Sequence, residues 1–99
     1  MRAHERKTLR ILGKVYTVKW WDEMPGDFGA CQPDDLMIHI SRNYPTEEQI
    51  TTIIHEAIEA YNNKLGLKMN HDLISRLDTL FYAFMADQGV NMRPLIEEK

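Results

Sequence analysis

The chain has 99 residues, a formal net charge of −3, and 43% hydrophobic and 27% charged residues. These values predict one globular domain spanning residues 1–99, with no apolar run long enough to cross a bilayer. The single cysteine, Cys31, excludes an internal disulfide and favours a reducing compartment, so we expect a cytoplasmic protein without membrane contact. The acidic balance argues against general nucleic-acid binding, which depends on lysine and arginine neutralising phosphates.

The chain begins with a pattern typical of β-structure. Apolar and polar residues alternate from Thr8 to Trp21, and a turn at Gly13-Lys14 divides the segment, which predicts a β-hairpin. Trp20 and Trp21 point to opposite faces of such a strand, so one belongs in the core and the other outside it.

Two more strands are expected before the pattern changes. Residues 28–32 predict a short strand and 36–41 a stronger one, with turns at 22–27 and 33–35. Tight turns between successive strands predict an antiparallel sheet of three to four strands, covering about 8–41.

Helical periodicity begins after Pro45. Thr46 and Gln49 have the spacing of a capping box, in which Thr46 is the N-cap and Gln49 reaches back to it. Apolar residues then recur at helical spacing over about 47–65, and Gly66 is a suitable C-terminal stop.

A second helix is predicted over about 71–88, with Asn70 as its N-cap. The short connection between the helices makes them antiparallel neighbours, and strands followed by helices define an α+β fold. The apolar side of this second helix consists of Leu73, Ile74, Leu77, Leu80, Phe81, Phe84 and Met85.

A candidate metal-binding motif, His55-Glu56-Ala57-Ile58-Glu59, lies within the first predicted helix. His55 and Glu59 share one helix face and can bind the same ion. The helix continues for roughly 9 Å beyond Glu59, and an extended linker can bring His71 back over that distance. Two histidines and a carboxylate are the ligand set of thermolysin-type catalytic zinc, so we predict that Zn²⁺ binds to His55, Glu59 and His71.

Glu56 is the candidate catalytic residue. It is rotated by about 100° from His55, so its carboxylate can flank the zinc-bound water without binding the ion. As a general base it would activate that water and pass the proton to the leaving amine, which makes hydrolysis of a peptide bond the predicted reaction. The motif departs from His-Glu-x-x-His because Glu59 replaces the second histidine, which should make the bound water less acidic than in a three-histidine site. Relative to the thermolysin-type set of two histidines and a carboxylate, the charge is unchanged and only the positions of Glu and His are exchanged.

These residues resemble a known family. The run Thr51-Thr52-Ile53-Ile54-His55-Glu56-Ala57-Ile58-Glu59-Ala60, with the strand 36–40 and with Leu65-Gly66-Leu67-Lys68, resembles the small zincin-like proteins common in phage genomes. Those proteins are relatives of minimal gluzincin and SprT-like metallopeptidases. The resemblance covers roughly 36–88.

The resemblance implies a zinc hydrolase in which His55, Glu59 and His71 hold the metal and Glu56 is the catalytic acid/base. It also implies a peptide or protein substrate, held by strand addition to a sheet edge at 36–41. A phage-encoded member would act in the cytoplasm of the host cell.

Other interpretations of the motif stay open. His55 and Glu59 can form a direct hydrogen bond without a metal, and Glu56 and Glu59 can be solvated surface charges. The domain can also be a catalytically inactive zincin-like protein that acts as a protein-binding module. Asp78 is either solvated or a partner that orients a metal-binding histidine. His39 is interpreted as exposed or as lining a cleft, and not as a ligand.

Overall fold

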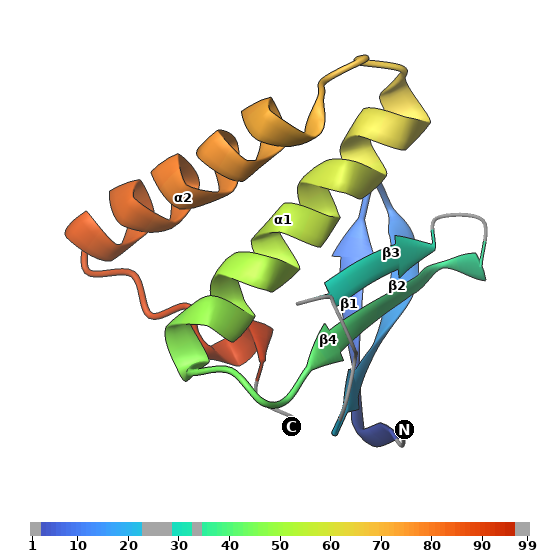
Figure 1. Cartoon of the computed structure of the whole chain (residues 1–99), viewed down its shortest axis with the longest axis vertical. Coiled ribbons are helices and arrows are strands. Elements are labelled where there is room, and N and C mark those ends of the chain that lie inside the picture. The colour runs from blue at the N-terminus through green and yellow to red at the C-terminus, as the bar shows by residue number, and fades with distance from the viewer. Residues whose placement is uncertain (1–2, 23–28, 33–34, 97–99) are drawn as a thin grey trace.

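The computed structural model describes residues 3–22, 29–32 and 35–96, which form a four-stranded sheet followed by two helices (Figure 1). The α+β class and the order of strands before helices are confirmed. Phe28 and most of the predicted turns at 22–27 and 33–35 lie outside the described residues. None of the described helices combines the length and apolarity needed to cross a bilayer. The elements are β1 (Ala3–Ile11), β2 (Lys14–Trp21), β3 (Gly29–Gln32), β4 (Met37–Ser41), α1 (Thr46–Leu65), α2 (His71–Asp87) and the 3₁₀ turn η2 (Arg93–Leu95).

The sheet has the strand order β1-β2-β4-β3 and is mixed, where a wholly antiparallel sheet was expected. β1 and β2 form the predicted hairpin, closed by Leu12 and Gly13, both with positive φ. β2 and β4 pair in parallel, with Thr17 opposite Met37. The reason is that β3 intervenes in the sequence and pairs antiparallel with β4, so the chain reverses twice and β4 regains the direction of β2.

β4 is an interior strand, hydrogen-bonded to β2 on one side and to β3 on the other. The prediction that residues 36–41 form an edge that accepts a peptide by strand addition is therefore wrong, because both sides of the strand are already paired. Within the described sheet the edges are β1 and the short β3.

The core lies between one face of the sheet and α1 (Figure 1). Trp20 is buried and Trp21 is half-buried on the opposite face, as the alternation predicts. Every second residue of β2 and β4 points towards the apolar side of α1, where the residues three and four apart along the helix lie. The buried cluster consists of Ile11, Tyr16, Val18, Trp20, Ile38, Ile40, Ile53 and Ala60.

The start of α1 differs from the predicted capping box. Pro45 occupies the N-cap position, and Thr46 is the first helical residue. Gln49 accepts a hydrogen bond from Trp20 Nε1 at 2.9 Å and donates from Nε2 to the Tyr44 carbonyl at 2.8 Å. Gln49 therefore ties the helix to the sheet, because a buried indole N–H requires an acceptor. At the other end Gly66 takes a left-handed conformation, with φ of 61°, as predicted.

α2 begins as predicted, with Asn70 Oδ1 accepting a hydrogen bond from the Leu73 amide at 2.8 Å. Most of the apolar side of α2 lies outside the core. Ile74 is buried, but most of the other apolar side chains remain wholly or partly exposed. The helix packs chiefly against α1 and stands away from the sheet (Figure 1). The exposed members are Leu73, Leu80, Phe81 and Phe84.

Candidate metal centre

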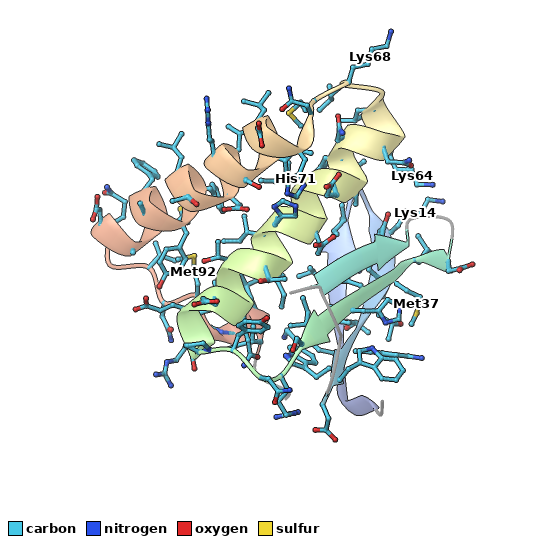
Figure 2. All side chains as sticks on the ribbon, in the orientation of Figure 1. Lys14, Met37, Lys64, Lys68, His71 and Met92 are labelled. Carbon is cyan, nitrogen blue, oxygen red and sulfur yellow. The ribbon has the colours of Figure 1, made fainter. Side chains whose placement is uncertain are left out.

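The helix pair brings His55, Glu59 and His71 together. His55 and Glu59 are one turn apart on α1, and His71 is the first residue of α2. Figure 2 shows the His71 ring between the two helices. One donor atom from each residue lies within 4.8 Å of the other two. The three predicted ligands therefore converge on one point.

The distances between the donor atoms suit a zinc ion. His55 Nε2 lies 3.5 Å from Glu59 Oε2, and His71 Nδ1 lies 4.0 Å from the same oxygen. Two ligands at 2.0–2.2 Å from a tetrahedral zinc ion are about 3.4 Å apart, so the two distances to Glu59 are within an ångström of those of a zinc site. The donor set is also suitable, because imidazole nitrogen and carboxylate oxygen are ordinary zinc ligands.

A buried carboxylate fixes the orientation of His55. Asp78 Oδ2 lies 2.7 Å from His55 Nδ1, and Thr79 Oγ1 donates to the other Asp78 oxygen at 2.9 Å. An ionised carboxylate only accepts, so His55 donates from Nδ1 and keeps its Nε2 lone pair when the ring is neutral. That lone pair then faces the Glu59 oxygen. A cation between these two acceptors, either a metal ion or a proton on Nε2, would stabilise their 3.5 Å approach.

His71 and Glu59 form the open side of the centre. The His71 side chain is 74% exposed and the Glu59 side chain 34% exposed. His71 Nε2 is 3.4 Å from Ser75 Oγ, one turn further along α2, and its Nδ1 is the nitrogen nearer Glu59. In each histidine, the nitrogen that does not face Glu59 has a partner on α2: Asp78 for His55 Nδ1 and Ser75 for His71 Nε2. The exposed side leaves room for a further ligand.

Glu56 lies beside this group and not within it. It is only 7% exposed and lies one turn after Thr52 on α1, the helix that packs against β3. Thr52 packs so closely against β3 that a Cβ added at Gly29 would be 2.6 Å from its Cγ2. Glu56 is not among the three residues whose donor atoms meet, and as the residue after His55 it is rotated by about 100° around the helix.

The alternatives for Asp78 are now distinguished, and His39 is half-buried where an exposed position was one expectation. Asp78 is the hydrogen-bond partner of His55 and is not solvated. His39 lies on the other face of the sheet, where its Nδ1 accepts from Trp21 Nε1 at 2.9 Å. Burial, together with the nearby Lys19 charge, lowers the pKa of His39. Ser75 was not anticipated, although its position one turn after His71 is a signal that helical spacing offers.

Comparison with known proteins gives no relative: no family model, no curated protein and no solved structure matches the chain. The function must therefore be inferred from the residues themselves.

The Asp78–His55 contact leads to a first prediction. Replacing a carboxylate that orients a metal-binding histidine typically weakens metal binding by 10–100-fold. We expect Asp78→Asn, which keeps the side-chain shape, to reduce zinc affinity by about that factor, measured by competition with a chromogenic chelator. Asp87→Asn, at the exposed end of α2, is the matched control and should bind zinc as the wild type does. Equal affinity in both variants would show that Asp78 has no part in the centre.

Proposed function

We propose that this protein is a zinc-dependent metallopeptidase that hydrolyses peptide bonds in a peptide or protein substrate. The observation that carries the proposal is the convergence of His55, Glu59 and His71, with the His55 ring oriented by the buried Asp78. Carboxylate–histidine pairs of this kind fix the tautomer and orientation of metal-binding imidazoles. A group held together only for stability has no need of three donors that meet at a partly open surface.

Each side chain has a role in the proposed reaction. His55, Glu59 and His71 hold the ion, and Asp78 keeps His55 Nε2 directed towards it. A bound zinc ion supplies Lewis acidity, which polarises the substrate carbonyl and lowers the pKa of water. Glu56 accepts the proton of the attacking water and then passes it to the leaving nitrogen. The exposed side next to His71 is where a peptide can approach.

The main rival to a metal is a proton. A protonated His55 would donate from both nitrogens, to Asp78 and to Glu59, and would satisfy the same contacts. The second histidine favours the metal. His71 Nδ1 lies 4.0 Å from the same Glu59 oxygen, which is too far for a hydrogen bond, but it supplies a further atom that can bind a metal ion. Three donors around one point are the arrangement that an ion stabilises.

A metal-binding protein without turnover is the second candidate. It is favoured by Glu59, whose charge reduces the electrophilicity of the centre relative to a site with three histidines. In that case the domain is a zincin-like binding module, and the centre stabilises the helix pair. The two candidates differ in one measurable property, hydrolysis that depends on the bound ion.

Reversible loss of activity on metal removal tests the proposal. Protein purified without a histidine tag and loaded with zinc is expected to cleave an unfolded protein substrate, to lose that activity on dialysis against a chelator, and to regain it with one equivalent of zinc. His55→Ala, purified identically, controls for contaminating proteases and should be inactive. Cleavage that survives chelation, or that persists in His55→Ala, would contradict the proposal. Zinc binding without cleavage would favour the second candidate.

A further inference from the structure

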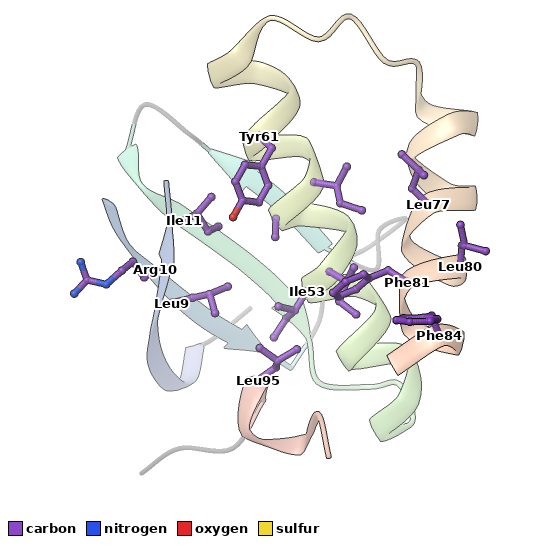
Figure 3. Close-up of a pocket in the computed structure, with 13 residues that line it drawn as sticks. Leu9, Arg10, Ile11, Ile53, Tyr61, Leu77, Leu80, Phe81, Phe84 and Leu95 are labelled. Carbon is purple, nitrogen blue, oxygen red and sulfur yellow. The ribbon is translucent and has the colours of Figure 1, made fainter. Parts of the chain in front are cut away.

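A large apolar groove lies beside α2. It has a volume of about 790 Å³ and lies between β1, α1, α2 and the start of the C-terminal segment. Figure 3 shows Tyr61 of α1 on one side and Leu77, Phe81 and Phe84 of α2 on the other, with Leu95 at one end. Arg10 is the one charged residue among those that line it. An apolar hollow of this kind on a small domain typically marks a contact surface.

Three α2 residues that line this groove, together with Leu73 one turn earlier, have the spacing of a helix–helix contact. Leu73, Leu77, Leu80 and Phe84 follow one another at intervals of four, three and four residues. This spacing is the 3.5-residue repeat with which two helices interlock their side chains. We call these four residues the apolar seam. α1 does not cover the seam, because Leu80 is 66% exposed and Phe84 59% exposed.

We propose that the apolar seam and the adjoining groove form the interface of a symmetric dimer of this chain. A second copy supplies both complementary parts, since it carries a helix with the same spacing and a groove to receive the projecting Leu80 and Phe84. A two-fold axis places each seam in the groove of the other copy and closes the assembly.

The exposed apolar area is close to what such a contact requires. A phenylalanine buries about 150–250 Å² when it is fully covered, so Phe81 and Phe84, each about half exposed, leave roughly 100 Å² apiece. With Tyr61, Leu73 and Leu80 the exposed apolar area is on the order of 500 Å² per chain, and the polar rim brings the contact towards the ~800 Å² per partner of a stable interface.

The proposed interface is independent of the metal centre. His71, Ser75 and Asp78 project from α2 about 160° away from the apolar seam, at 100° per residue. Figure 2 shows His71 between the helices, whereas Figure 3 shows the seam residues Leu77, Leu80 and Phe84 along the groove. Dimerisation therefore leaves the open side of the metal centre accessible, and it can be tested whether or not the peptidase proposal holds.

Analytical ultracentrifugation of the full chain tests the dimer. From micromolar to submillimolar concentration, the wild type is expected to reach twice the mass of one chain. Leu80→Glu places a charge in the middle of the contact and should raise the dissociation constant by about thirtyfold or more. Leu80 is exposed in the single chain, so the variant keeps its fold, which circular dichroism verifies. Zinc binding by Leu80→Glu should equal that of the wild type.

The matched control is Ala86→Glu, which adds the same charge to an exposed position on α2, about 150° around the helix from the seam. It should dimerise as the wild type does. A wild type that is monomeric at every concentration would overturn the proposal, and so would a monomeric wild type that instead binds a helix of another protein through this groove. A dissociation constant that Leu80→Glu leaves unchanged would also overturn it.

Discussion

Glu56→Gln is expected to reduce peptide hydrolysis by about 10²–10⁴-fold while zinc binding remains at the wild-type level. The amide keeps the shape of the side chain but cannot accept the proton of the attacking water. Glu56 lies outside the group formed by His55, Glu59 and His71, so the substitution leaves the ligands in place. Steady-state kinetics with matched metal analysis of each preparation separates loss of the base from loss of the ion.

The matched control for this experiment is Glu48→Gln, an exposed acid in the first turn of α1. It removes the same charge from the same helix and should retain full activity. The unfolding temperature is the second readout, because Glu56 is only 7% exposed and makes interactions in the fold. Lost activity in a variant that remains folded at the assay temperature indicates a catalytic role. Full activity in Glu56→Gln would rule out the proposed general base.

The helices were predictable because their signals are local. Gly66 ends α1 and Asn70 begins α2 through their own backbone and side-chain chemistry, so their roles follow from the sequence. The parallel pairing of β2 with β4 is not local. It depends on β3 occupying the outer side of β4, and the alternation of residues within a strand is the same whether the strand is interior or at an edge.

The limits of prediction at the candidate centre have a similar origin. The spacing of His55 and Glu59 is a property of one helix, and the short linker was sufficient to bring His71 near them. Whether Asp78 faces the solvent or His55 depends on the rotation of α2 about its axis, which its apolar residues did not determine. Helix periodicity assigned Phe81 and Phe84 to the apolar side of α2, and the rotation that turns Asp78 towards His55 leaves both of them exposed.

Protein purified without a tag is expected to contain about one zinc ion per chain, as the group of three donors within 4.8 Å predicts. Glu59→Ala should lose the ion, because the Glu59 oxygen is the donor that lies near both histidines. Mass spectrometry with inductively coupled plasma ionisation measures the content directly. Glu48→Gln, whose charge lies outside the centre, should retain the zinc.

The same ion should stabilise the fold, since its ligands come from two helices that otherwise share a limited contact. Zinc at 100 times its dissociation constant adds about 2.7 kcal/mol, which corresponds to a rise in unfolding temperature on the order of 10–20 °C for a domain of this size. Glu59→Ala should show no such rise. Acidification should abolish it in the wild type as well, because zinc binds the deprotonated forms of His55, Glu59 and His71. A folded wild type that contains no zinc and is not stabilised by it would indicate that His55 is held by a proton between Asp78 and Glu59, and would remove the basis of the peptidase proposal.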